Sequence, residues 1–290
     1  MQPAEVERFC QHLRTRHYSH HSIASYALDL QLFLAEINKP ISRITWRDVD
    51  RFIEQQHGRG LAATTINRRL HAVKRFFDYL VVETERLAAN PIKPSHFLKP
   101  GRPLPKKLSG QQVKRLFAAI SNRMDRALFL LMLRCGLRVS EVAQLKLSDI
   151  DWQQKALLVR QGKGRKDRWV YLSADAIEGL RECLAIRPAF VPGEHFFWNQ
   201  KRQNQPLSIK AIQKKIERYA KAGEVTASCH SLRHTFASNL LEEGAEVISI
   251  KEFLGHESIT TSERYARLSN QKVKQVYLQT IKKVIQKTKV

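Results

Sequence analysis

Apolar residues recur at helical spacing through the first 90 residues of the chain. Apolar side chains three or four residues apart share one face of a helix, so this pattern predicts amphipathic helices. Thr45 and Asp48 are spaced as in a capping box that opens the third of them. We expect a helical domain over residues 1–90, with helices at residues 3–13, 22–37, 46–56 and 65–88.

A segment rich in proline and lysine follows this region. Five prolines fall between residues 91 and 107. Proline fixes φ and removes a backbone donor, so a helix cannot continue through such a segment. We interpret residues 91–107 as a linker between two domains.

The pattern in residues 108–290 is mixed. Apolar helical stripes occupy most of it, but residues 150–172 alternate between apolar and polar positions and are interrupted by two turn sequences. Such alternation is typical of short antiparallel strands. The predicted fold class is therefore mainly α with a small antiparallel β-sheet, an α+β arrangement.

Composition narrows the class of partner. The net charge is +23 and the pI is about 10.2, which favours a polyanion such as nucleic acid. No apolar run reaches the roughly 18 residues of a membrane span, so we expect no membrane partner. The four cysteines form no CxxC pair, which is typical of reduced thiols in a cytosolic protein.

The predicted helix at residues 65–88 carries basic residues on the face opposite its apolar stripe. These residues either contact DNA phosphates or form a solvated basic surface, and the net charge favours DNA. The four are Arg68, Arg69, Lys74 and Arg75.

A second set of residues has the chemistry of a phosphodiester site. Arginine binds phosphate oxygens bidentately, lysine can protonate a leaving alkoxide, and tyrosine can attack phosphorus. Residues i and i+3 at a helix start share a face, so His230 and Arg233 can point at one phosphate. The set comprises Arg138, Lys163, His230, Arg233, His256 and Tyr265.

Alternatives exist for several of these residues. Glu141 either orients the Arg138 guanidinium or forms an ordinary salt bridge with it three residues away. A metal site at His230 and His234 is disfavoured because no third ligand is apparent. The glycines around Lys163 do not form a phosphate-binding Walker loop. Tyr277 fits an apolar stripe and is expected in a core or an interface.

The order and spacing of these motifs resemble those of the tyrosine site-specific recombinases. The segments GLRVSEV, GKGRKDR, HSLRHTFASNLLEEGA and IKEFLGHESITTSERYA carry the likeness, which is greatest to the Xer-like and transposon-borne members. The resemblance implies a SAM-like core-binding domain and a catalytic domain that together form a C-shaped clamp on DNA. It also implies that Tyr265 is the nucleophile and that neither a metal nor another cofactor takes part.

The resemblance further implies how the protein works in the cell. Double-stranded DNA with paired half-sites is the expected partner, bound by a homotetramer on two sites, with or without a partner recombinase. The expected location is the cytoplasm, on the bacterial nucleoid. A type IB topoisomerase-like nickase and a DNA-binding protein without catalysis are the alternatives, although no catalytic residue is missing.

The last 20 residues form another amphipathic pattern. Its apolar stripe must be buried, either on its own domain or on a neighbouring protomer. The resemblance favours the neighbour and hence a C-terminal exchange helix. The stripe consists of Val273, Tyr277, Ile281, Val284 and Ile285.

Overall fold

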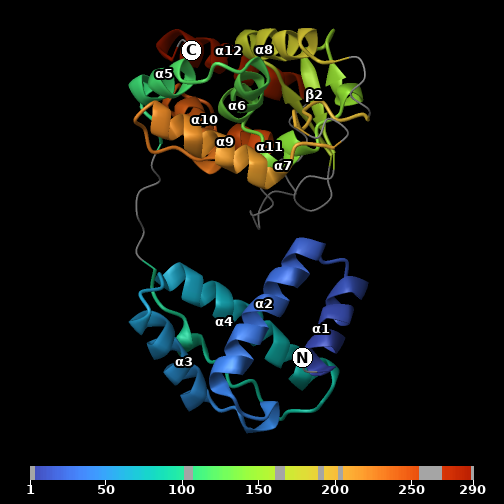
Figure 1. The fold of residues 1–290 in the computed structure, drawn as a ribbon, viewed down its shortest axis with the longest axis vertical. Helices are drawn as coiled ribbons and strands as arrows, with labels where there is room; N and C mark the ends of the chain where they lie inside the picture. Colours follow the sequence, from blue (N-terminus) through green and yellow to red (C-terminus); the bar gives the residue numbers. More distant parts are fainter. Residues whose placement is uncertain are drawn as a thin grey trace. The chain divides into compact units, whose positions relative to one another are not determined.

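The structure, a computed structural model, describes residues 4–100, 107–160, 167–188, 193–201, 205–254 and 270–288. The chain divides into two compact units, Met1–Pro103 and Leu104–Val290. Figure 1 shows the first unit in blue to green and the second in green to red. Within the described ranges, no helix combines the length and apolarity that a bilayer span requires.

The first unit is helical, as the apolar pattern predicted. A capping box of Thr45 and Asp48 opens α3, also as predicted. The helix expected over residues 65–88 ends sooner, at Asp78, and a five-residue π-helical turn at Tyr79–Glu83 follows it. The four α-helices are α1 (Ala4–Thr15), α2 (His20–Ile37), α3 (Trp46–Gly58) and α4 (Ala63–Asp78), with 3-10 turns at Ile41–Arg43 and Pro94–His96.

Aromatic side chains fill the core of this unit. Phe33 packs edge-on against Phe52 and Phe77, at ring-centroid distances of 5.0 and 6.4 Å. Edge-to-face pairs of this kind add to the stability gained by burial alone. The core therefore joins α2, α3 and α4.

The packing of the first unit continues past residue 90, where the linker was expected to begin. Ile92 is buried in the helical core, and the side chain of Asn67 on α4 binds both backbone groups of Leu98, at 2.8 and 2.9 Å. Proline stops a helix but does not stop an extended segment from packing, so composition alone misses this attachment.

The second unit combines helices with a three-stranded antiparallel sheet of order β1-β2-β3. Leu157 of β2 pairs with Ile150 on one side and Val170 on the other. The strands are β1 (Ile150–Asp151), β2 (Ala156–Val159) and β3 (Arg168–Tyr171). The helices are α5 (Gly110–Ala118), α6 (Arg123–Cys135), α7 (Val139–Ala143), α8 (Ala174–Ala185), α9 (Ile209–Ala222), α10 (Cys229–Glu242), α11 (Val247–Leu254) and α12 (Asn270–Lys287), with a 3-10 turn at Leu147–Asp149.

Helix α6 lies at the centre of this unit and packs against α8 and α10 (Figure 1). Gly136 ends it in the left-handed conformation, at φ 65°. A Cβ atom at Gly136 would lie 2.5 Å from the ring of Phe236 on α10. Only glycine fits both the dihedral angle and the close approach. The end of α6 is thereby brought against α10.

Helix α12 packs on its own domain within the single chain, which is one of the two ways of covering its stripe. Docking on a neighbour stays a prediction. Tyr277, Ile281 and Val284 are buried against Phe236, Phe253 and other residues of the same unit. In the isolated chain, the nearest apolar surface able to cover the stripe belongs to the domain itself. Tyr277 is a core residue, as expected, and its hydroxyl donates to the Arg134 carbonyl at 2.9 Å.

A buried arginine fixes the far end of α12. The Arg134 side chain is fully buried and binds Asp175 at 2.7 Å. It also donates to the hydroxyl and carbonyl oxygens of Thr288, at 2.7 and 3.1 Å. These bonds satisfy acceptors that the end of a helix otherwise leaves free.

Because α12 packs on its own domain, Ile281→Ala should destabilise the second unit by about 2–5 kcal/mol. The substitution leaves a cavity among buried side chains. The melting temperature should fall by several degrees. The exposed neighbour Lys283 provides the control, since Lys283→Ala should leave the melting temperature nearly unchanged. Equal melting temperatures for the two variants would contradict burial of the stripe in its own domain.

Candidate functional site

Arg138 lies where α6 gives way to α7. Gly136 turns the chain, Leu137 is fully buried, and Arg138 is the residue that caps α7. Glu141, in the first turn of α7, accepts from the Arg138 backbone N–H at 2.8 Å and from its guanidinium Nη1 at 2.7 Å. Glu141 therefore both caps the helix and orients the Arg138 side chain.

The Glu141 carboxylate binds more than one arginine. Both its oxygens accept from Arg168, the first residue of β3, at 2.9 Å each. Arg233 on α10 lies 3.9 Å from the same carboxylate. Three arginines thus surround one carboxylate, which leaves an excess of two positive charges in this group.

The ionisation of Glu141 reflects these contacts. Burial alone would raise its pKa, since its side chain is 7% exposed. The hydrogen bonds and charge of Arg168, together with the hydrogen bonds from Arg138, outweigh burial and bring the pKa below its ordinary value. Glu141 is therefore a carboxylate at neutral pH.

Arg233 is the most deeply buried of the three arginines, at 6% exposure. Its guanidinium donates to the carbonyl of Gly136 and, at 2.6 Å, to the carbonyl of Leu254 at the end of α11. Burial, and then the positive charge of Arg138, lower the pKa of Arg233 to about 10. It remains protonated at neutral pH, in a place where a positive charge is costly without an anion.

His230 lies one helical turn before Arg233, in the first turn of α10. The helix is capped by Ser228, whose hydroxyl accepts from the Ser231 N–H at 3.1 Å. The His230 side chain is exposed, so it is accessible to a ligand. The start of a helix adds a positive potential that favours anions.

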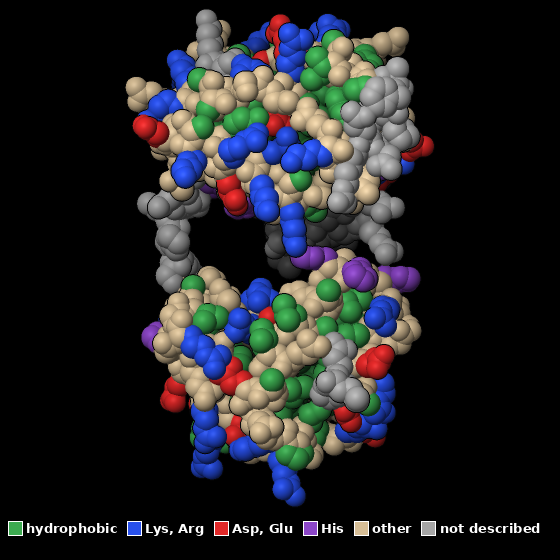
Figure 2. Space-filling model, viewed as in Figure 1, with side chains coloured by type: hydrophobic (Ala, Val, Ile, Leu, Met, Phe, Trp, Pro, Cys, Tyr) green, Lys and Arg blue, Asp and Glu red, His purple; other side chains and the backbone are tan. Residues whose placement is uncertain are grey.

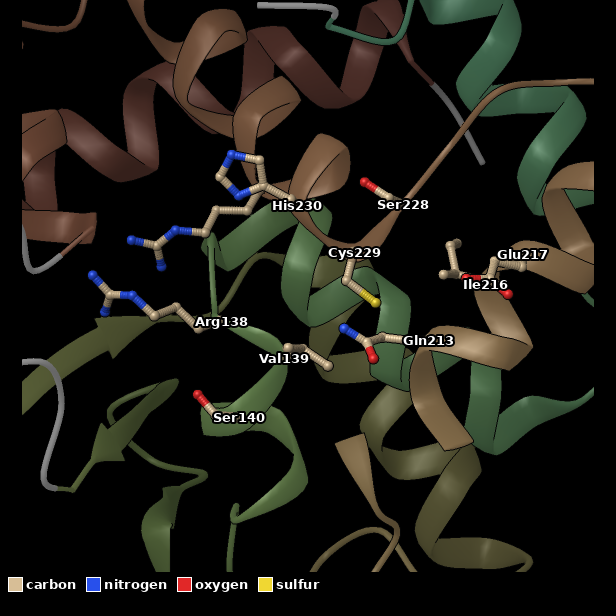
Figure 3. A pocket seen from close by; sticks show the side chains of 10 residues that line it. Arg138, Val139, Ser140, Gln213, Ile216, Glu217, Ser228, Cys229 and His230 are labelled. Atoms are coloured by element: carbon tan, nitrogen blue, oxygen red, sulfur yellow. The ribbon is translucent and has the colours of Figure 1, made fainter. Parts of the chain in front are cut away.

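Arg138, His230 and Arg233 line one pocket of about 450 Å³. In Figure 3, Arg138 and His230 lie toward one end of the pocket, and Gln213 and Glu217 of α9 lie toward the other. Cys229 also lines the pocket, and burial raises the pKa of its thiol to about 11, so it stays protonated. The arginine end of the pocket is suited to a phosphate group.

Three of the six predicted site residues thus come together, and the other three, Lys163, His256 and Tyr265, lie outside the described residues. In the sequence, Lys163 falls between β2 and β3, and His256 comes two residues after Leu254. Within the described ranges, no group of three or more metal-binding side chains is present, and His234 lies 3.4 Å from the Ser238 hydroxyl.

Arg168 was not identified from the sequence. It is 27 residues from Glu141, and an arginine at the start of a strand is ordinarily a surface residue. Two signals were present: Arg168 is the last residue of the segment GKGRKDR, which carries the likeness, and Glu141 lies three residues after Arg138. A carboxylate that caps a helix beside an arginine has a second oxygen for another partner, but periodicity does not identify that partner.

The basic residues of α4 have partners within the first unit. Arg68 forms a bidentate pair with the buried Asp29, and Arg69 donates to Gln56. Lys74 pairs with Asp78 at 2.7 Å, and Arg75 stacks on Tyr18. Arg68 and Lys74 remain 51% and 40% exposed. Figure 2 shows Lys and Arg side chains spread over the visible face of each unit.

Both parts of the chain match known protein families. Residues 106–272 match the phage integrase family, and residues 6–84 match the N-terminal SAM-like domain of phage integrases. Tyrosine recombinase XerA of Pyrococcus furiosus is 33% identical over 275 residues, covering 93% of this chain and 91% of the relative.

Solved structures share the fold. A lambda integrase dimer bound to a core site has a TM-score of 0.71 at 20% identity, covering 88% of this chain and 94% of that one. A lambda integrase tetramer bound to a Holliday junction also has a TM-score of 0.71 at 20% identity, covering 90% of this chain and 76% of that one. The predicted mainly helical fold with a small antiparallel sheet is confirmed.

The contacts of Glu141 predict that Glu141→Gln lowers the free energy of unfolding by about 3 kcal/mol, because it removes a buried negative charge that lies within 3.9 Å of three arginines. The folded-state pKa of Glu141 lies below the ordinary value of 4.5, so this stabilisation is present above pH 4.5. It is lost as the pH falls through the folded-state pKa. Urea denaturation at pH 7 and pH 4 measures the difference between the two proteins at each pH.

The exposed Glu178 on α8 serves as the control, because Glu178→Gln should change stability by less than about 0.5 kcal/mol. A difference between wild type and Glu141→Gln that is absent at pH 7, or that grows as the pH falls, would contradict the role assigned to Glu141.

Proposed function

This chain belongs to the phage integrase family, and we propose that it cleaves and rejoins duplex DNA at specific short core sites through a covalent bond between Tyr265 and a DNA phosphate. It is a tyrosine recombinase, and the reaction serves the integration, excision or resolution of DNA elements or multimers.

One observation carries the proposal. Arg138, Arg233 and His230 line a single pocket, and the arginines around Glu141 carry more positive charge than that carboxylate neutralises. A phosphodiester is an anion that suits this positively charged end of the pocket. Arg138 and Arg233 bind its non-bridging oxygens and stabilise the charge that develops in the pentacoordinate transition state.

In the proposed reaction, the hydroxyl oxygen of Tyr265 attacks phosphorus and the bond from phosphorus to the 5′-oxygen breaks. The products are a 3′-phosphotyrosyl bond and a 5′-hydroxyl, to which Lys163 supplies the proton. His230 and His256 hold the phosphate, and these imidazoles take up the proton that the Tyr265 hydroxyl loses. The 5′-hydroxyl of another strand then attacks the phosphotyrosyl bond. The bond energy is kept at each step, so the reaction needs no ATP and no metal or other cofactor.

The first unit contributes binding to duplex DNA. We assign Arg68, Arg69, Lys74 and Arg75 on α4 to contacts with the phosphate backbone, supported by the exposed fraction of Arg68 and Lys74. Their partners within the unit, such as Asp29 and Asp78, hold the side chains in place before DNA arrives. Both units are proposed to bind the duplex.

The proposed active assembly is a tetramer on two DNA sites, acting alone or with a partner recombinase on nucleoid DNA in the cytoplasm. The lambda integrase tetramer on a Holliday junction supports this arrangement. In the assembly, α12 acts as an exchange helix. Tyr277, Ile281 and Val284 leave their own domain and dock on the equivalent surface of a neighbour, as in domain swapping.

Replacing Tyr265 with Phe should abolish strand cleavage and leave site binding nearly unchanged, because only the nucleophilic oxygen is removed. The core site is first obtained by selecting bound duplexes from a random library. Denaturing gels then detect the covalent adduct. Tyr277→Phe is the matched control and should still form the adduct, since Tyr277 is buried away from solvent. An adduct formed by Tyr265→Phe would disprove the assignment, and relaxation of plasmids that lack the site would favour a topoisomerase.

If Lys163 is the general acid, the Lys163→Ala variant should cleave DNA about 100-fold or more slowly than wild type. A substrate whose bridging 5′-oxygen is replaced by sulfur should restore the rate, because a thiolate leaves without a proton. Single-turnover cleavage of both substrates measures the effect. A variant that is equally slow on the two would show that Lys163 has another role.

A further inference from the structure

We propose that Arg168 is a positioning residue for the phosphate site, and that it acts by fixing the carboxylate that orients Arg138. This inference rests on the proposed function. Arg168 does not line the pocket that holds Arg138, His230 and Arg233, so its action is indirect.

The geometry of Arg168 is that of a fixed fork. Its Nη1 and Nη2 each donate to a different oxygen of Glu141 at 2.9 Å, and its side chain is 13% exposed. A bidentate pair sets the plane of the carboxylate as well as its distance, which a lysine ammonium cannot do. The orientation of Glu141 is therefore determined by β3.

The same oxygens also hold Arg138. Oε1 accepts from Arg138 Nη1 and from Arg168 Nη1, and Oε2 accepts from the Arg138 backbone and from Arg168 Nη2. A rotation of the carboxylate would move the Arg138 guanidinium, which is 25% exposed at the pocket. Catalytic groups lose much of their effect when displaced by about 1 Å.

Arg168 also supplies charge. With it, three arginines share one carboxylate, and without it the excess of positive charge in this group falls from two to one. The two remaining arginines would then be neutralised to a larger extent by Glu141. Arg168 thus leaves Arg138 and Arg233 with more of their charge available to a phosphate.

A third bond extends the same network to α11. Arg168 Nε donates to the Phe253 carbonyl at 3.2 Å, beside the bond from Arg233 to the Leu254 carbonyl at 2.6 Å. Two arginines from β3 and α10 therefore bind successive carbonyls at the end of α11. One residue, Arg168, connects the strand that follows Lys163 in the sequence with the helix that precedes His256.

The test compares Arg168→Met and Arg168→Lys with wild type in single-turnover cleavage of the selected core site. We expect the cleavage rate at saturating protein to fall by about 100-fold in Arg168→Met and by about 10-fold in Arg168→Lys, with site affinity within about 2-fold of wild type. Arg187→Met is the matched control, because Arg187 also donates to backbone carbonyls in this unit but does not line the pocket. Its rate should stay at the wild-type value.

A second substrate separates positioning from general damage to the fold. A methylphosphonate at the cleaved position lacks the charge of one non-bridging oxygen, so its cleavage depends less on Arg138. The ratio of phosphate to methylphosphonate rates should therefore fall by about 10-fold or more in Arg168→Met, toward the ratio of Arg138→Ala. If Arg168→Met does not melt cooperatively, the same measurement is made on Arg168→Lys. Its ratio of phosphate to methylphosphonate cleavage rates should then lie below the wild-type ratio.

Two results would overturn the inference while the proposed function stands. One is wild-type cleavage by the folded Arg168 variants. The other is slower cleavage at the wild-type ratio of the two substrates, which would indicate a merely structural role. If wild-type protein forms no covalent adduct on the selected site, the proposed function itself fails, and this inference fails with it.

Discussion

The buried carboxylate of Glu141 is the group on which the site depends. It caps α7, orients Arg138, pairs with Arg168 and lies near Arg233, so it joins α7, β3 and α10. Carboxylate oxygens have several acceptor positions, which is why one side chain can satisfy three arginines. Without this carboxylate, three partly buried cations would repel one another. Glu141 therefore makes it possible to gather positive charge in one place within a folded domain.

The charge of the Glu141 carboxylate is smaller than the summed charge of the three arginines around it. One carboxylate does not neutralise three guanidinium groups, and the pKa of Arg233 is lowered to about 10 by burial and by Arg138. The described part of the site therefore gathers positive charge at the end of the pocket lined by Arg138 and Arg233. In the proposed reaction, a DNA phosphate binds to these arginines, and they stabilise it most strongly when negative charge increases in the transition state.

Local sequence patterns predicted most of the elements, but not the contacts between distant residues. The capping box of α3, the glycine that ends α6 and the hairpin at residues 150–172 follow from short-range rules. The pair of Arg168 and Glu141, and the contact of Gly136 with Phe236, depend on tertiary packing. The surface that covers the stripe of α12 was also left open by the sequence, because an apolar stripe shows that it must be covered but not by which surface.

The most direct test of the account is to identify the residue that becomes bonded to DNA. Wild-type protein is trapped on a nicked core site, the adduct is digested, and mass spectrometry locates the peptide that carries the nucleotide. The account predicts a 3′-phosphotyrosyl bond at Tyr265. A nucleotide on Tyr277 or on any other residue, or a protein that cleaves the site without becoming bonded to it, would contradict it.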